Sequence, residues 1–279
     1  MRGGPASRRL PLVLCYHKVD RRLELGVTRI SPRRFARQME RLAWRGWRAI
    51  TIWELLATAR GDRPAGRGEV AITFDDGYRA LREHAFPVLA ALGWPATCSV
   101  ITDFAGRLNR WDVAYGGRRF AHLAWRDMRR WEERGITFVS HTATHPRLSW
   151  CDDGAVAREL ARSRAALRAA LGGEGHRVVS YPFGVARPRE RRLAAEAGFE
   201  AGLSLAGRWD GDVMAVNRLP IYPWALPVPG EGALGAIERS VALLANRCAV
   251  GTSLWQRMTA PEGPVRPGLG DRVSEAFGD

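Results

Sequence analysis

Lysine is almost absent from this chain of 279 residues: Lys18 is the only one, and nearly all of the positive charge is arginine. A net charge of +14 ordinarily suggests nucleic acid or an anionic surface as a partner. The arginines are scattered over every segment, however, and no nucleic-acid-binding motif accompanies them. We therefore interpret the charge as a compositional bias and expect no nucleic-acid partner.

Cysteine is also scarce, and long apolar runs are missing. Cys15, Cys98, Cys151 and Cys248 are far apart and include no Cys-x-x-Cys pair, which excludes a disulfide-dense secreted scaffold. Cys15 and Cys98 lie in apolar runs, so we expect them in the core. No stretch approaches the roughly 20 apolar residues of a membrane span, and the run 10–15 is too short for a signal peptide. We expect no transmembrane segment and a location in the cytoplasm or at the periphery of a membrane.

Short apolar runs alternate with amphipathic patterns, which indicates parallel strands joined by crossover helices. The expected strands are 11–17, 48–50, 69–74, 96–101, 136–140, 177–182, 201–205 and 217–221. The expected helices are 32–46, 52–60, 79–92, 125–134, 153–171, 188–197 and 233–247. Six or more such repeats favour closure of the sheet. We predict a single α/β barrel domain over residues 1–250 and a Pro/Gly-rich tail over 251–279.

Four polar motifs come directly after expected strands. They are Tyr16-His17, Asp75-Asp76-Gly77, the segment 141–145 with a histidine at each end, and Tyr181-Pro182-Phe183-Gly184. In a (β/α) barrel the carboxyl ends of the strands meet on one face, where catalytic residues are found. The four motifs are therefore expected to meet in one cleft.

The residue types in these motifs favour a metal-dependent hydrolase. One carboxylate and two imidazoles can hold a divalent ion, and the second carboxylate is then left beside it as a base. An isolated Asp-Asp-Gly is more often a turn, and an isolated His-x-x-x-His pair is weak evidence, so the prediction depends on their coincidence at strand ends. His17 is either a general acid or a histidine satisfied by a backbone partner. His84, His122 and His176 lie away from strand ends and are given no role.

These motifs resemble a known family. The segments 73–78, 140–146 and 181–184 are similar to the first three motifs of the polysaccharide deacetylases, the NodB-homology domain of family 4 carbohydrate esterases. The segments 14–19 and 31–56 are similar to the branch of biofilm poly-N-acetylglucosamine deacetylases. The resemblance spans about residues 11–222. It implies a distorted (β/α) barrel of about seven strands that removes N-acetyl groups from an N-acetylglucosamine-containing glycan or glycoconjugate.

The resemblance also implies a role for each site residue. Asp76, His141 and His145 bind one divalent metal ion, with Zn²⁺ expected first and Co²⁺ or Ni²⁺ also suited to the ligands. Asp75 is the general base for the metal-bound water that attacks the amide carbonyl, and the Phe183 backbone N–H stabilises the oxyanion. The expected substrate-binding residues are Tyr78, Trp111, Asp112, Tyr181 and Pro182. Trp111 and Trp209 are the first choices for sugar-stacking rings, and Asp103 shares the loop of Trp111.

Two departures from the family pattern affect the catalytic assignments. The third motif normally begins with an arginine that orients the base, but Ser180 occupies that position, and we predict that Arg218 replaces it. The closing motif with a catalytic histidine is missing, because no histidine follows His176. In the biofilm branch the histidine of an N-terminal Tyr-His takes the acid role, and His17 matches it.

Three other readings compete with this one, and the first of them is disfavoured. Two histidines and one carboxylate also describe a non-haem Fe(II) oxygenase, but Asp75 beside Asp76 favours hydrolysis. The substrate could instead be a non-carbohydrate linear amide. A catalytically weak, glycan-binding homologue is the third alternative, because a fold does not guarantee activity. The oligomeric state is not predicted.

Overall fold

The computed structural model describes residues 9–22, 28–109, 119–205 and 209–223. Within them, one sheet of nine strands is paired in parallel throughout. Its strands are β1 (Leu12–Tyr16), β4 (Arg48–Ile50), β5 (Glu69–Phe74), β6 (Ala96–Val100), β7 (Ile136–Ser140), β8 (Val178–Ser180), β9 (Ala201–Ser204), β10 (Val216–Asn217) and β11 (Leu219–Pro220). A separate parallel pair joins β2 (Lys18–Val19) to β3 (Arg29–Ile30).

The last two strands close the sheet into a barrel. The strand order is β10-β9-β8-β7-β6-β5-β1-β11, and only Arg218 separates β10 from β11 in the sequence. β10 pairs with β9, whereas β11 pairs with β1 at the opposite end of the order. The interrupted strand 216–220 therefore completes a ring of about seven strands, and β4 is added alongside β5. The predicted α/β barrel is confirmed.

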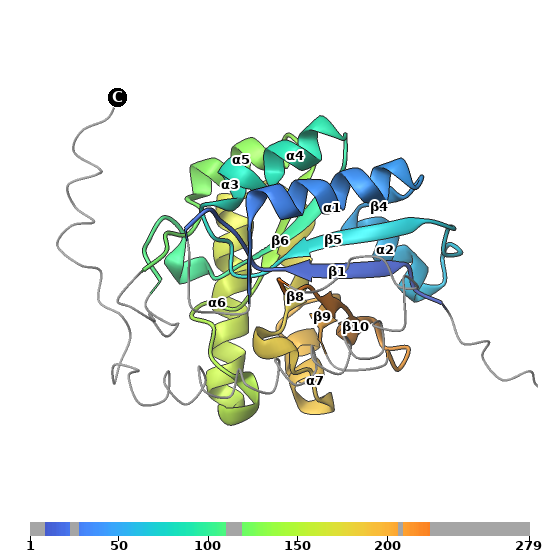
Figure 1. The fold of residues 1–279 in the computed structure, drawn as a ribbon. Coiled ribbons are helices and arrows are strands. Elements are labelled where there is room, and N and C mark those ends of the chain that lie inside the picture. The colour runs from blue at the N-terminus through green and yellow to red at the C-terminus, as the bar shows by residue number, and fades with distance from the viewer. Residues whose placement is uncertain (1–8, 23–27, 110–118, 206–208, 224–279) are drawn as a thin grey trace, which may run out of the picture.

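The helices surround the barrel on opposite sides. They are α1 (Pro32–Trp44), α2 (Ile52–Arg60), α3 (Leu81–His84), α4 (Phe86–Ala91), α5 (Trp125–Glu132), α6 (Asp153–Ala170) and α7 (Pro188–Glu196). Short 3₁₀ turns are η1 (Thr102–Phe104), η3 (Leu148–Trp150), η4 (Glu174–Arg177), η5 (Pro182–Gly184) and η6 (Val213–Ala215). In Figure 1, α1, α3, α4 and α5 lie above the strands, α7 lies below them, and α6 runs from beside the left ends of the strands to below them.

Local sequence signals explain where several helices begin. Ser31 accepts a hydrogen bond from Arg34 N at the start of α1, and Pro32 occupies the first turn, where its missing N–H costs nothing. Thr51 and Glu54 form a capping box at the start of α2. The helix predicted over 79–92 is instead two short helices that meet at Ala85. The prediction of one continuous helix was wrong, because Pro87 has no N–H to continue the hydrogen-bond ladder from α3 into α4.

One of the buried apolar clusters lies between the strands and the upper helices and is rich in aromatic rings. Tyr16, Phe35, Phe74 and Phe86 pack in a chain with ring centroids 5.2–5.8 Å apart, and all are buried. Such packing is among the largest apolar contributions that side chains make. Because Tyr16 and Phe74 are the last residues of β1 and β5, this core fixes the strand ends that carry His17 and Asp75.

Some predictions fall outside the described residues. They are the helix 233–247, the domain boundary near 250 and the tail 251–279, together with Cys248. Among the described cysteines, Cys15 and Cys98 are buried as expected. No helix of the described part combines the length and apolarity that a membrane crossing requires.

Candidate active site and metal centre

The aspartate pair stands where β5 ends. Asp75 continues the ladder, because its N–H donates to the carbonyl of Tyr16 on β1 (2.9 Å). Asp76 then adopts a left-handed backbone with φ of 70°, and Gly77 follows with φ of 67°. A Cβ on Gly77 would lie 2.8 Å from Cγ1 of Val100, so only glycine fits this turn. The abrupt turn separates the two carboxylates and gives each its own surroundings.

The histidine loop follows β7 and contains two more left-handed residues. Thr142 has φ of 66° and His145 has φ of 65°. The Thr142 hydroxyl accepts a hydrogen bond from the His145 N–H (3.0 Å), which folds the loop back on itself. The rings of His141 and His145 consequently lie 4.7 Å apart. Left-handed non-glycine residues are uncommon and gather at functional sites, where the surroundings hold them in place.

Asp76, His141 and His145 form a buried triad. Asp76 Oδ1 lies 3.5 Å from His141 Nε2 and 3.6 Å from His145 Nε2. A tetrahedral ion with bonds of about 2.0–2.1 Å places its ligand atoms about 3.3–3.4 Å apart, close to these separations. His141 Nδ1 lies 2.8 Å from the carbonyl of Ser180, which requires the proton on Nδ1 and leaves the Nε2 lone pair facing Asp76.

The charge state of the triad also suits a cation. Burial raises the pKa of Asp76, but His141 and His145 outweigh it and bring the pKa to about 2. Burial lowers the pKa of His145 to about 3, so this imidazole is neutral near pH 7. Burial also opposes a proton on His141, yet the carboxylates of Asp75 and Asp76 raise its pKa. One carboxylate, two imidazole nitrogens and a negative potential between them fit Zn²⁺, Co²⁺ or Ni²⁺.

The second carboxylate, Asp75, is held by Arg218. The two guanidinium nitrogens of Arg218 each donate to one Asp75 oxygen at 2.8 Å. One of them also donates to Ser180 Oγ (2.9 Å), and that hydroxyl lies 3.2 Å from Asp75 Oδ1. Burial raises the pKa of Asp75, but the Arg218 guanidinium outweighs it and holds the pKa well below its usual range. Ser180 thus leaves room for an arginine that arrives from the break between β10 and β11.

Cys15 in β1 and His17, directly after β1, lie beside Asp75. Donor atoms of Cys15, His17 and Asp75 lie within 4.8 Å of one another, and the Cys15 thiol donates to Asp75 Oδ2 (3.4 Å). This second group fits a cation less well than the triad does, because both Asp75 oxygens already accept from Arg218. Burial also raises the pKa of the Cys15 thiol well above its usual value, which keeps it protonated. Burial lowers the pKa of His17, although Asp76 and Asp75 oppose this effect.

The Phe183 side chain lies against the triad. Among the described residues, it is the fourth non-glycine residue with a left-handed backbone, with φ of 59°. Its ring centroid lies 4.9 Å from that of His145. The Arg147 guanidinium lies 5.4 Å from the Phe183 ring and 5.2 Å from the ring of Trp150. The oxyanion role of the Phe183 N–H stays a prediction.

The expected substrate-binding residues fall into different settings. Tyr78 and Tyr181 are 2% and 0% exposed. Tyr78 stacks on His122, and Tyr181 packs in a separate cluster that includes Phe199. Pro182 is also buried, and Trp111 and Asp112 lie outside the described residues. Substrate contact by these residues stays a prediction.

Two further residues named from the sequence have side-chain partners of their own. Trp209 donates from Nε1 to the Asp212 carbonyl and packs against the cluster containing Ile50. Asp103 forms an ion pair with Arg162. Trp150, whose ring lies near the same Arg147 guanidinium as the Phe183 ring, is 41% exposed, and sequence reasoning did not single it out.

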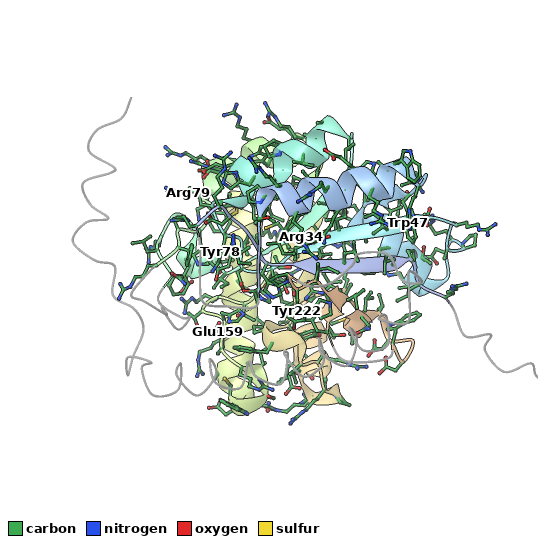
Figure 2. The ribbon with its side chains drawn as sticks, viewed as in Figure 1. Arg34, Trp47, Tyr78, Arg79, Glu159 and Tyr222 are labelled. Atoms are coloured by element: carbon green, nitrogen blue, oxygen red, sulfur yellow. The ribbon has the colours of Figure 1, made fainter. Side chains whose placement is uncertain are left out.

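Sequence reasoning also missed two residues that contact the site backbone. His122 Nδ1 lies 2.7 Å from the Asp76 carbonyl oxygen. The Glu159 carboxylate accepts from the N–H groups of Ala143 (3.0 Å) and Thr144 (2.8 Å) and from the Thr144 hydroxyl (2.8 Å). Figure 2 labels Glu159 on α6 and Tyr78 in the loop after β5. Neither His122 nor Glu159 follows a strand, so the rule that located the ligands could not find them.

Comparison with known proteins agrees with this geometry. The polysaccharide deacetylase family model matches residues 62–202. The chain is 26% identical over 214 residues to YxkH of Bacillus subtilis, which covers 76% of this chain and 71% of that protein. It is also 26% identical over 138 residues to the poly-beta-1,6-N-acetyl-D-glucosamine N-deacetylase of Escherichia coli K12. That match covers 47% of this chain but only 20% of the enzyme.

Solved structures share the fold. IcaB from Ammonifex degensii aligns with a TM-score of 0.65 at 26% identity, over 84% of this chain and 96% of that one. The Streptococcus pyogenes deacetylase PplD, in complex with acetate, aligns with a TM-score of 0.68 at 20% identity, over 79% of this chain and 96% of that one. The family match covers half of the chain and includes Asp75, Asp76, His141 and His145. This chain therefore belongs to the polysaccharide deacetylase family.

Proposed function

We propose that this protein is a metal-dependent N-deacetylase that releases acetate from an N-acetylglucosamine-containing glycan or glycoconjugate. The observation that supports it best is that two adjacent carboxylates have different partners. Asp76 faces two imidazole nitrogens, whereas Asp75 faces a guanidinium and stays ionised. An oxygenase with the same ligands would not need the second carboxylate.

Asp76, His141 and His145 would hold a divalent ion, which would supply Lewis-acid polarisation of the amide carbonyl and activation of a water molecule. Asp75 accepts the proton of the attacking water, and Arg218 fixes the orientation of that carboxylate. The Phe183 N–H donates to the developing oxyanion. His17 gives a proton to the leaving nitrogen. Water oxygen bonds to the acyl carbon, the C–N bond breaks, and acetate and a free amine leave.

The test is acetate release from N-acetylglucosamine oligomers by protein supplied with Zn²⁺, Co²⁺ or Ni²⁺. Asp75→Asn preserves the shape of the side chain and removes the base, so we expect turnover to fall about 10²–10⁴-fold while metal binding persists. His17→Ala tests the acid in the same assay. Asp153→Asn, at an exposed carboxylate paired with Arg189, is the control and should keep full activity. Equal turnover in Asp75→Asn and the wild type would contradict the assignment, and no release by the wild type would contradict the proposed substrate.

A further inference from the structure

His122 belongs to a segment that lies beside the aspartate turn. Tyr78 and His122 form an isolated antiparallel bridge. Leu123 N donates to the Gly77 carbonyl (2.9 Å), and Arg79 N donates to the Ala121 carbonyl (2.8 Å). The segment 121–123 therefore pairs directly with residues 77–79, which continue the chain from the metal ligand Asp76.

The His122 side chain extends this pairing to Asp76 itself. Its Nδ1 lies 2.7 Å from the Asp76 carbonyl oxygen, and its side chain is 2% exposed. A carbonyl only accepts hydrogen bonds, so Nδ1 carries the proton. The ring stacks on Tyr78 with centroids 5.2 Å apart and planes 26° apart, and it packs against Phe104 at 5.7 Å. Packing and the hydrogen bond together allow the ring one orientation.

This hydrogen bond holds the backbone of Asp76, which is in an uncommon conformation. Asp76 has a left-handed backbone that a non-glycine residue adopts only when its surroundings hold it. The direction of its carboxylate depends on that conformation, because the same residue must place Oδ1 within 3.5–3.6 Å of both imidazoles. A donor that holds the Asp76 carbonyl restrains the peptide plane, and therefore the position of the ligand atom.

We propose that His122 is a positioning residue for the metal centre, and that its Nδ1–H holds the Asp76 carbonyl so that the carboxylate faces His141 and His145. The inference rests on the metal site of the proposed function. It predicts that the hydrogen-bond donor matters for metal affinity more than the imidazole ring does. Two substitutions separate these contributions, one that keeps a ring without the donor and one that keeps the donor without a ring.

The experiment titrates metal-free protein with Zn²⁺ by calorimetry. His122→Phe keeps a ring that can stack on Tyr78 but has no donor, whereas His122→Asn keeps a donor at the position of Nδ1 but has no ring. We expect Zn²⁺ affinity to fall about 10–100-fold in His122→Phe, the usual cost of removing an outer partner of a ligand, and to stay within about threefold in His122→Asn. Thermal unfolding of the metal-free variants reports separately on folding.

The control is His176, whose Nδ1 also lies near a backbone carbonyl but away from the aspartate turn. His176 Nδ1 lies 3.2 Å from the Gly173 carbonyl in an exposed setting. His176→Phe should leave Zn²⁺ affinity unchanged. Wild-type affinity in His122→Phe, or an equal loss in His122→Asn and His122→Phe, would overturn the inference. If His122→Phe fails to fold, a tenfold loss of Zn²⁺ affinity in His122→Asn would by itself overturn the inference. Absence of Zn²⁺ binding by the wild type would overturn the metal site itself, and the inference with it.

Discussion

Arg218 is the residue on which the state of Asp75 depends. Its guanidinium is completely buried, and it donates to both Asp75 oxygens, to Ser180 and to Thr73. A buried ion pair contributes little net stability compared with an apolar pair of the same volume, but removing one partner leaves a buried charge unpaired. Removing one charge is therefore expected to lower the stability of the fold more than removing both charges.

We predict that Arg218→Met destabilises the metal-free protein by about 3–5 kcal/mol, because Asp75 is left buried without a counter-charge. Asp75→Asn combined with Arg218→Met should be less destabilising than the sum of the two single changes. Urea denaturation of the four proteins in this double-mutant cycle measures the coupling. Additive free energies would show that the two side chains do not depend on one another. Arg218→Lys should recover only part of the lost turnover, because an ammonium cannot bind both oxygens in a fork.

At the residue scale, the sequence located the triad because its members follow strands. Asp75, Asp76, His141 and His145 each come directly after, or within a few residues of, a strand that an apolar run makes visible. The sequence could not show the left-handed backbones of Asp76 and Phe183, because only a few per cent of non-glycine residues adopt this conformation. These conformations are imposed by tertiary contacts, and those contacts come from residues such as His122 that no local pattern distinguishes.

At the scale of elements, α6 supports the loop that carries both histidines. Glu159 on α6 binds the Ala143 and Thr144 backbone through one carboxylate oxygen and the Thr144 hydroxyl through the other. Ser163, one turn further along the helix, lies 2.7 Å from the Ser140 hydroxyl at the end of β7. The helix therefore holds the loop at both ends, and the positions of His141 and His145 depend on it.

We predict that Glu159→Ala loosens this loop. The amides of Ala143 and Thr144 lose their acceptor, so they should exchange with solvent faster, and Zn²⁺ affinity should fall about tenfold. Glu159→Gln retains a carbonyl oxygen for the two N–H groups and should remain close to the wild type. Amide exchange by mass spectrometry, together with calorimetric titration, checks both effects. Arg158→Ala, at the exposed neighbouring position, is the control. Unchanged exchange in Glu159→Ala would show that the loop holds itself in place.

The parallel barrel was easier to predict than the ends of its strands. Alternation of apolar runs and helical patterns gave the parallel barrel, since that pattern reflects burial along the whole chain. The strand expected over 217–221 is instead broken at Arg218, where its partner changes from β9 to β1. A change of partner leaves no mark in hydrophobic periodicity, because periodicity reflects the burial of side chains and not which strand the backbone pairs with.

At the scale of the whole molecule, the site places several histidines where a proton is disfavoured. Burial lowers the pKa of His145 to about 3 and that of His122 to about 4. For His122, the charge of Lys18 acts in the same direction, and the Asp76 carboxylate and carbonyl oppose it. Asp75 and Asp76 have pKa values below their usual range. All of these groups bind fewer protons in the folded state than in the unfolded state at acidic pH.

The sign of the pH dependence follows from these shifts. The unfolded state binds a proton at His122 with a pKa of about 6.5, whereas the folded state does so only near 4. The stability from His122 is therefore fully present above about pH 6.5 and is lost as the pH falls toward 4. Between pH 7 and pH 5 this loss is about 2 kcal/mol.

We predict that the metal-free wild type loses about 2 kcal/mol more stability than His122→Asn between pH 7 and pH 5, because asparagine does not titrate in this range. Urea denaturation at the two pH values, with a chelator present, measures the difference. Stability lost through His145 and the two aspartates is common to both proteins and cancels in the comparison. An equal loss of stability in the wild type and in His122→Asn would contradict the prediction, because it would mean that folding does not disfavour the proton on His122.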